Sequence, residues 1–239
     1  MLGRALLVGD GSVLFSLISC GKTIACAGFG NVTWGICKKA SQLGAKVVTL
    51  SGPDGYIFDP DGVNSEDKIN YLVTMRSSGR NRVQDYADRF KVPFYPGEKP
   101  WGVKVDIMMP SAMQNDVHLE HAKQIAENRV RYYIEVANMP TTNDALRFLM
   151  EQENMIVAPS KAVNAGGVAT SALEMSQNSE RLVWSEKEVD DQLHGIMTRI
   201  YQNSVDAAQR NGLGYNLVEG ANIAGFERVA DAMMKQGIF

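Results

Sequence analysis

Residues 28–33 have the composition and spacing of a phosphate-binding turn. They read GFGNVT, overlap the end of an apolar run from Thr23 to Phe29, and open a helix-compatible segment. The first glycine allows a tight turn, and the second lets the backbone approach a pyrophosphate that a Cβ would block. The N–H groups and positive dipole end of the following helix would hold the phosphates. The segment predicts a dinucleotide site, and a glycine turn without a ligand is the alternative.

The acid that binds the adenosine ribose should lie about 20 residues after the glycines, at the end of the second strand. The second predicted strand, Lys46 to Ser51, ends on a serine, and Asp54 follows shortly after it. Asp54 either bonds the ribose hydroxyls or is an ordinary turn aspartate. No lysine or arginine lies between Ser51 and Asp67, so the local charge favours NAD over NADP. Arg80 or Arg82 could still reach a 2′-phosphate from elsewhere.

Two asparagines follow later strands. Asn138 comes after the predicted strand Tyr132 to Ala137, and Asn164 lies beyond the predicted strand Met155 to Ala158. Open α/β sheets bind their ligands at the carboxyl ends of the strands. An amide there can bond both the donor and the acceptor of a nicotinamide carboxamide. Both asparagines are therefore candidate cofactor ligands, with a turn or capping role as the alternative.

Other clusters are assigned structural roles. His118 and His121 share a predicted helix without a third ligand at recognisable spacing, so we expect them to face solvent and to bind no metal. A basic cluster is interpreted as a solvated loop and comprises Arg76, Arg80 and Arg82. Three methionines are assigned to the core: Met108, Met109 and Met113.

Composition limits the class of protein. The 239 residues suit one large domain or one domain with an appendage, and 45% hydrophobic and 21% charged residues are typical of a soluble globular protein. A formal net charge of -3 gives no support for binding to nucleic acid or to a membrane. Cys20, Cys26 and Cys37 have no metal-type spacing, and their odd number is typical of reduced thiols. We therefore expect a cytoplasmic protein.

The N-terminal segment, residues 1–20, is interpreted as an atypical leader, either native or foreign to the protein. Its apolar run, Val13 to Ile18, has six residues, too few to span a bilayer. Asp10 precedes this run, which is unlike a signal peptide. Residues 21–239 would then form one nucleotide-binding domain that includes the C-terminal helices.

Predicted strands and helices alternate from residue 21 to about residue 160. A further strand is expected at Asp106 to Met109, and a loop rich in turn residues at 52–62. Helices are expected at 31–43, 65–77, 82–90, 115–128 and 141–152. This order predicts an α/β fold, a Rossmann-like, doubly wound and mainly parallel sheet with C-terminal helices.

The C-terminal helices are expected at 162–178, 185–210 and 221–236. In the second of them, five apolar residues share one face at helical spacing: Val189, Leu193, Ile196, Met197 and Ile200. This stripe is interpreted as packing on the sheet domain. Packing on a partner outside the chain is the alternative.

Longer segments resemble one enzyme family, the hexameric bacterial glutamate dehydrogenases. The resemblance extends from Gly21 to Gly237 and is carried by GFGNVTWG (28–35), TLSGPDGY (49–56), EVANMPTT (135–142), APSKAVNAGGVATSALEMSQNSERLVW (158–184) and GANIAGFERVADAMMKQG (220–237). EVANMPTT and NAGGVATS are far more specific than a glycine turn alone.

The resemblance implies oxidation of L-glutamate to 2-oxoglutarate and ammonium with NAD or NADP, in a homo-hexamer of two-domain subunits. This chain resembles the second, cofactor-binding domain. By family match, the pyrophosphate would be held by Gly28, Phe29, Gly30, Asn31 and Val32. Asn138 and Asn164 would lie near the nicotinamide, and the GPDG turn that contains Asp54 resembles the NAD-using members. Ser171 would reach the distal carboxylate of the substrate, with Val168 lining the same pocket.

The sequence departs from the family pattern at several positions. Thr33 replaces the usual alanine or glycine, which predicts looser packing of strand and helix. Ser111 and Met113 replace a cysteine and a threonine, so no cofactor contact is assigned to Met113.

The family's first domain, with its catalytic lysine and aspartate, has no counterpart in this sequence. We therefore expect no catalytic residue in the chain and no turnover of glutamate by the chain alone. The alternative is a stand-alone, non-catalytic nucleotide-binding or regulatory module. A related amino-acid dehydrogenase is a third interpretation, less favoured because Ser171 suits a dicarboxylate.

Overall fold

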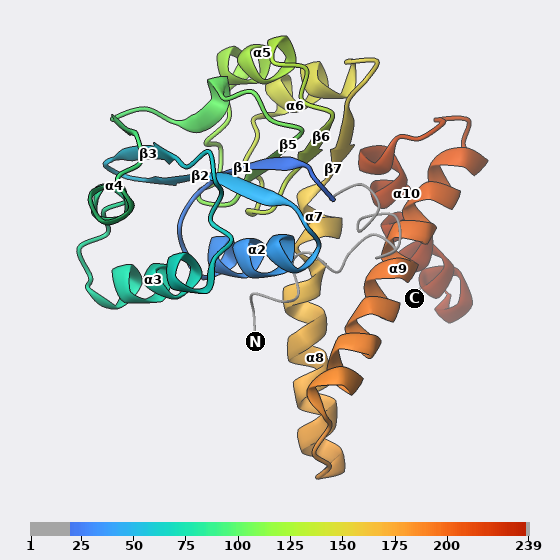
Figure 1. The fold of residues 1–239 in the computed structure, drawn as a ribbon. Coiled ribbons are helices and arrows are strands. Elements are labelled where there is room, and N and C mark those ends of the chain that lie inside the picture. The colour runs from blue at the N-terminus through green and yellow to red at the C-terminus, as the bar shows by residue number, and fades with distance from the viewer. Residues whose placement is uncertain (1–19, 238–239) are drawn as a thin grey trace.

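Residues 20–237 are described by a computed structural model, in which helices cover both faces of one seven-stranded sheet (Figure 1). The strands are β1 (Thr23–Ala27), β2 (Lys46–Gly52), β3 (Gly55–Phe58), β4 (Phe94–Pro96), β5 (Ile107–Pro110), β6 (Tyr132–Ile134) and β7 (Ile156–Ala158). Their order across the sheet is β4-β3-β2-β1-β5-β6-β7. The neighbouring strands β2, β1, β5, β6 and β7 pair in parallel. β3 pairs antiparallel with both β2 and β4. The predicted mainly parallel sheet is confirmed.

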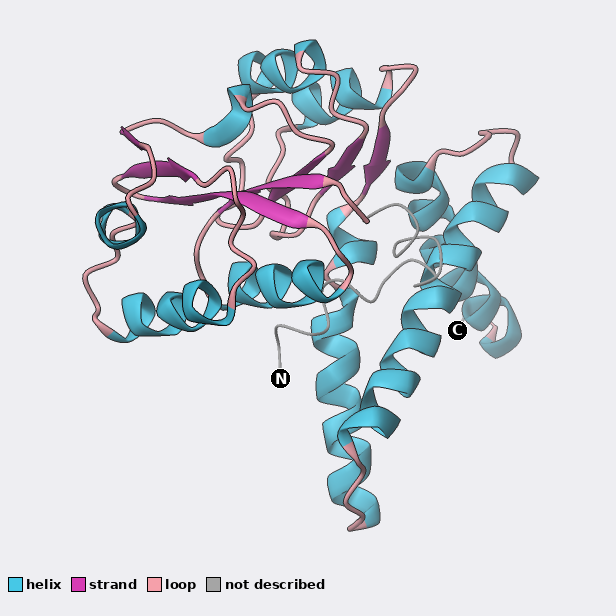
Figure 2. Cartoon of the chain, in the orientation of Figure 1, coloured by secondary structure: helices cyan, strands magenta, loops and turns pink. Residues whose placement is uncertain are grey.

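The helices lie outside the sheet, as Figure 2 shows by colour. They are α2 (Asn31–Gln42), α3 (Glu66–Ser77), α4 (Gln84–Phe90), α5 (Leu119–Glu127), α6 (Asn143–Met150), α7 (Ser160–Val163), α8 (Ala165–Glu180), α9 (Glu186–Arg210) and α10 (Leu217–Gln236), with a short 3-10 helix, η2 (Pro100–Gly102). α2 and α3 cover one face of the sheet, and α5 and α6 cover the other.

The central strand β1 is buried on both faces. Ile24 and Cys26 belong to the core under α2, α3 and α4, whereas Ala25 and Ala27 belong to the core under η2, α5 and α6. A central parallel strand requires apolar side chains on both faces in this way. The strand order reverses at β1, because β2 lies on one side of it and β5 on the other. Such a reversal opens a crevice at the carboxyl ends of the strands.

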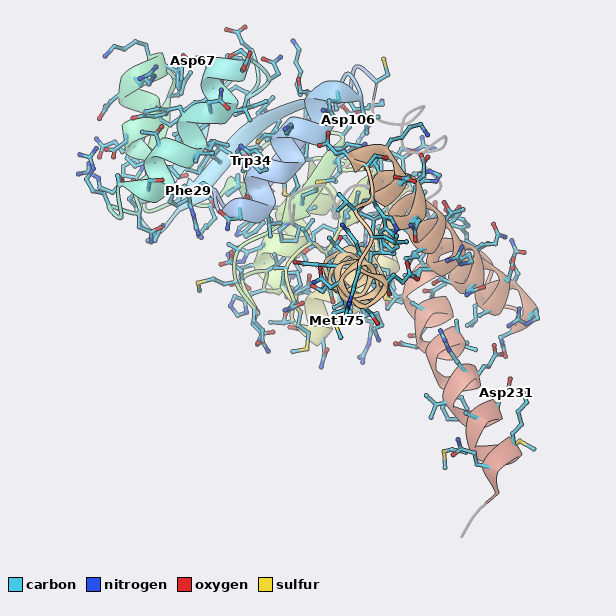
Figure 3. The ribbon with its side chains drawn as sticks, turned by 90° about the horizontal axis from the view of Figure 1, so that it is seen from below. Phe29, Trp34, Asp67, Asp106, Met175 and Asp231 are labelled. Carbon is cyan, nitrogen blue, oxygen red and sulfur yellow. The ribbon has the colours of Figure 1, made fainter. Side chains whose placement is uncertain are left out.

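α8 and α9 extend away from the sheet, whereas α10 begins against β7, where Val218 joins the core. Figure 3 shows α8 end-on, with Met175 on it, and α10 running outward past Asp231. Leu193 and Met197 of the α9 stripe pack against Ala169 and Leu173 of α8. The interpretation that the stripe packs on the sheet is therefore wrong, because it packs on a neighbouring C-terminal helix. Packing on a partner outside the chain stays a prediction.

The segment 52–62, predicted as a loop, contains β3, which pairs with β2 and β4. Gly55 explains the error. Its φ is +144°, and a Cβ there would lie 2.2 Å from the carbonyl oxygen of Tyr95 on β4. A glycine that reads as a turn signal thus serves the close approach of a strand.

Two smaller predictions are also wrong. Met113 is 63% exposed, whereas Met108 and Met109 are fully buried as expected. α5 begins only after His118, rather than at residue 115 or 116. Residues 1–19, which hold nearly all of the predicted leader, lie outside the described residues. Between residues 20 and 237, no helix has the length and apolarity that crossing a membrane requires.

Candidate functional site

The glycine turn joins the carboxyl end of β1 to the N terminus of α2. Gly28 has a φ of +145°, and a Cβ there would lie 3.0 Å from Ser111 Oγ and 3.1 Å from Thr33 Oγ1. Both the backbone angle and the space therefore demand glycine. Gly30, the N-cap of α2, has an ordinary φ of −75°. No side chain caps this helix and its first turn holds no acid, so its N–H groups and dipole are open to an anion.

Thr33 fits the turn tightly. Its side chain is fully buried, and its hydroxyl oxygen lies 3.1 Å from Ser111 Oγ. Ser111 in turn donates a hydrogen bond to the carbonyl oxygen of Ala27 at 3.1 Å. Thr33 is therefore enclosed and its hydroxyl has a partner, whereas a wider spacing of strand and helix stays a prediction.

Arg76, at the end of α3, lies over the turn. A Cβ on Gly30 would stand 3.2 Å from Arg76 Nη1. Arg80 instead pairs with Asp85 at 3.1 Å, and Arg82 donates to the side chain of Gln84. All three arginines are exposed, as the solvated-loop interpretation requires. That interpretation did not foresee the position of Arg76 beside Gly30, where it adds positive charge near the open N terminus of α2.

The other residues of the turn present different groups. Phe29 is 5% exposed, and its ring lies 3.1 Å from where a Cβ on Gly52 would be, so the Phe29 side chain belongs to the core. Val32 also packs against that core. Asn31 is exposed in the first turn of α2. The turn can thus offer backbone N–H groups and the Asn31 side chain to a ligand.

Asp54 lies in the turn between β2 and β3 and caps a helix. Its carboxylate accepts hydrogen bonds from the N–H groups of Val83 and Gln84, both at 3.0 Å, at the start of α4. A carboxylate has about four acceptor positions, so acceptor capacity is left for ribose hydroxyls. Nearby, Ser51 at the end of β2 is buried, and its hydroxyl has no hydrogen-bond partner. The ribose contact of Asp54 stays a prediction.

Asn138 and Asn164 come together although 26 residues separate them. Asn164 Nδ2 donates to Asn138 Oδ1 at 2.5 Å. This bond leaves the amide nitrogen of Asn138 and the amide oxygen of Asn164 available, one donor beside one acceptor. A primary carboxamide carries the complementary pair. The structure therefore places the two predicted residues side by side in an arrangement suited to such a group.

Backbone hydrogen bonds connect the glycine turn to this amide pair along the carboxyl edge of the sheet. Ser111 N–H, just after β5, donates to Ala27 O at 2.9 Å. The N–H groups of Val136 and Ala137, just after β6, donate to Pro110 O at 3.1 and 2.9 Å. Consequently the segments after β1, β5 and β6 form one continuous edge that ends at Asn138.

Val168 and Ser171 lie in the first two turns of α8, following Asn164. Val168 is 76% exposed, and Ser171 is also exposed. The structure gives both side chains an open surface, and their contact with a substrate stays a prediction.

His118 and His121 have a local structural contact. His118 is exposed, and its backbone N–H donates to Nδ1 of His121 at 3.1 Å, at the start of α5. Trp101 lies beside His121, with ring centroids 5.9 Å apart. Within residues 20–237, no group of three or more histidine, cysteine, aspartate or glutamate side chains could hold a metal ion.

Solved structures with this fold include a glutamate dehydrogenase that is 65% identical, with a TM-score of 0.93 over 98% of this chain and 54% of its own. The glutamate dehydrogenase of Plasmodium falciparum is 38% identical, with a TM-score of 0.90 over 100% of this chain and 51% of its own.

Relatives by sequence include the NAD-specific glutamate dehydrogenase of Clostridium symbiosum. It is 70% identical over 218 residues, which are 91% of this chain and 48% of that protein. The NADP-specific glutamate dehydrogenase of Haemophilus influenzae is 46% identical, over 92% of this chain and 49% of that protein. The chain thus spans about half the length of these relatives. The family model of Glutamate/Leucine/Phenylalanine/Valine dehydrogenase matches residues 16–237, and the chain belongs to this family.

Proposed function

We propose that this chain is the dinucleotide-binding half of a glutamate dehydrogenase, which oxidises L-glutamate to 2-oxoglutarate and ammonium with NAD or NADP. The observation that carries the proposal is the edge of the sheet that runs from the glycine turn to the Asn138–Asn164 pair. One end of this edge suits an anion, and the other suits a carboxamide. A nicotinamide dinucleotide carries those groups, with the pyrophosphate between adenosine and nicotinamide.

The residues at the turn fit a pyrophosphate. Gly30 keeps the backbone bare beside the open N terminus of α2, and Arg76 adds a cation there. When bound, the cofactor supplies the hydride acceptor. The chain's own residues bind and orient it, and none of them is proposed to transfer a proton.

NAD is proposed as the preferred cofactor, with NADP as the second. Asp54 would repel a 2′-phosphate near the end of β2, where the described basic side chains Arg80 and Arg82 are already engaged on α4. The 70% identity to an NAD-specific relative supports the same choice.

The substrate pocket is proposed to form against a second half of the protein. Val168 and Ser171 would supply one wall, with Ser171 near the distal carboxylate of glutamate. One hydroxyl cannot orient an amino acid with three ionised groups, so the remaining ligands and the general base are proposed to lie in the half that this chain does not match. For the full-length enzyme we further propose a homo-hexamer in the cytoplasm.

Exposed apolar side chains on α10 fit the same proposal. Phe226 is 72% exposed, Val229 60% and Met233 58%, and their spacing places them along one side of the helix. A contiguous apolar strip of this kind is typical of a surface that another domain covers.

A stand-alone regulatory module would also contain a nucleotide turn. The match to glutamate dehydrogenases extends over 91% of the chain and includes the C-terminal helices, so it does not favour a module that keeps only nucleotide binding.

Two assays on the purified chain test the proposal. Fluorescence titration with NADH should show saturable binding at one site per chain. Saturating glutamate and NAD should yield no NADH with this chain alone, and should yield NADH once the separately produced N-terminal half of the Clostridium symbiosum enzyme is added. Absence of NADH binding would contradict the cofactor role, and turnover by the chain alone would contradict the proposed division of catalytic residues.

A further inference from the structure

Glu135 is a buried carboxylate just beyond β6, three residues before Asn138 in the chain. Its exposed fraction is 3%. Its Oε2 accepts a hydrogen bond from the N–H of Ser160 at 3.0 Å, at the first residue of α7. Its backbone N–H donates to Ala158 O on β7 at 3.0 Å. Glu135 thus ties the end of β6 to the segment that leads from β7 into α7.

α7 is a single helical turn that carries Asn164 at its C-terminal end. Asn164 N–H donates to Ser160 O at 2.8 Å, and the side chain of Asn164 donates to Asn138. The contacts therefore form a closed loop, which runs from Glu135 to Ser160, on to Asn164, across to Asn138 and back along the chain to Glu135. Few backbone torsions lie within this loop, so a shift at Ser160 moves Asn164 directly.

Two linked hydroxyl groups lie near this carboxylate, and that of Thr141 influences its pKa. The Tyr133 hydroxyl lies 2.8 Å from Thr141 Oγ1. Thr141 and Tyr133 are both buried.

Burial of this carboxylate has an energetic cost. Burial raises the pKa of Glu135 above its ordinary value, although the Thr141 hydroxyl, the Ser160 N–H and the charge of Lys161 each oppose the rise. An apolar side chain would fill a buried position without this penalty. The hydrogen-bond acceptor of Glu135 is therefore expected to have a role other than filling space in the core.

We propose that Glu135 is a positioning residue for the nicotinamide end of the bound dinucleotide, and that it acts by capping α7 and so holding Asn164 against Asn138. This inference rests on the proposed function, because it assigns the amide pair to the nicotinamide carboxamide. Glu135 does not touch the cofactor. Its effect is confined to the nicotinamide end, since the pyrophosphate turn lies at the other end of the same edge.

The test compares two ligands, NADH and ADP-ribose, which lacks the nicotinamide. Glu135→Met keeps a similar side-chain volume and removes the acceptor. It should weaken NADH binding roughly 3- to 10-fold, the effect of losing one well-placed hydrogen bond, and should leave ADP-ribose binding within about twofold. Glu135→Gln keeps an acceptor oxygen and should bind both ligands like the parent. Glu127→Met, on the exposed side of α5, is the matched control.

Ser160→Pro removes the same hydrogen bond from its donor side. Proline is well accepted at the first position of a helix, and Pro159 already has the extended backbone (ψ 147°) that a following proline requires. This variant should also lose affinity for NADH but not for ADP-ribose. It provides the same test if Glu135→Met does not fold.

Unchanged NADH binding in folded Glu135→Met or in Ser160→Pro would overturn the proposal. Equal loss of NADH and ADP-ribose binding would also overturn it, because that result marks a general structural role. If the parent chain binds neither ligand, the proposed dinucleotide function itself fails, and this outcome differs from both of the others.

Discussion

The hydroxyl oxygens of Thr33 and Ser111 lie 3.1 Å apart at the buried base of the glycine turn, joining α2 to the end of β5. Because Ser111 donates its own proton to Ala27 O, Thr33 is the donor of the pair. A Cβ on Gly28 would meet both side chains. Two residues that depart individually from the family pattern thus contact each other and support the same turn.

Thr33→Val should therefore lower the free energy of unfolding by about 1 kcal/mol, since one buried hydrogen bond is lost while Ser111 keeps its bond to Ala27. NADH binding should stay within about twofold, because no group facing the ligand changes. Urea unfolding and NADH titration measure the two quantities. Thr74→Val, at an exposed position of α3, is the control. A loss of NADH affinity without a loss of stability would contradict this role.

Gly30→Val should leave the chain folded and weaken NADH binding by roughly tenfold or more, because the new side chain occupies the approach to the pyrophosphate. In the free protein the nearest atom to this Cβ is the flexible end of Arg76, which can move. Gly102→Val, where a Cβ meets nothing within 4 Å, is the matched control. Circular dichroism verifies folding. Parental NADH affinity in the Gly30 variant would rule out the turn as the phosphate site.

Asp54→Asn should narrow the preference for NADH over NADPH, because the charge that repels a 2′-phosphate is removed while one acceptor for the start of α4 is kept. The cap weakens, so a stability loss of about 0.5–1 kcal/mol is expected. Parallel titrations with both cofactors measure the ratio, and Asp88→Asn on the exposed side of α4 is the control. Tighter binding of NADPH by the parent would overturn the cofactor assignment.

The parallel part of the sheet was predictable because each of its strands is a short apolar run followed by a helical pattern. β3 was not, because Gly55 and the prolines and aspartates around it are also turn signals. What distinguishes Gly55 is the carbonyl oxygen of Tyr95, which belongs to a strand about 40 residues further along the chain. Local sequence does not encode that approach.

The candidate site also has some features that the sequence predicts and others that it does not. The glycine turn and the positions of Asn138 and Asn164 after strands follow from periodicity and turn chemistry. The placement of Arg76 over Gly30, and the contact of Glu135 with Ser160, depend on tertiary packing across 46 and 25 residues of sequence. Sequence gave no signal that separated Arg76 from its neighbours Arg80 and Arg82.

Tyr86→Phe tests the packing of α4, which Asp54 caps. Tyr86 is fully buried and donates to Asp59 Oδ2 at 2.8 Å, and Asp59 is also paired with Lys68 at 2.7 Å. The variant should lose about 1 kcal/mol of stability at pH 7.

The alkaline behaviour of this variant follows from the same contact. Burial, with the hydrogen bond to Asp59 and its charge, raises the pKa of Tyr86 well above its ordinary value. A raised pKa contributes stability that is present below the unfolded-state pKa of about 10 and is lost as pH rises beyond it. The decline in Tm above about pH 10 should therefore be shallower in Tyr86→Phe than in the parent. An identical decline would show that Tyr86 does not control it.

The location of the bound dinucleotide is tested most directly by NMR of the isotope-labelled chain with and without NADH. Resonances of the Asn31 and Val32 backbone N–H groups should shift, together with the side-chain amides of Asn138 and Asn164. ADP-ribose should shift the first pair and leave the second pair nearly unchanged. Shifts confined to another region, such as the groove between β7 and the α9–α10 connection lined by Met155 and Tyr215, would contradict a dinucleotide site along the carboxyl edge of the sheet.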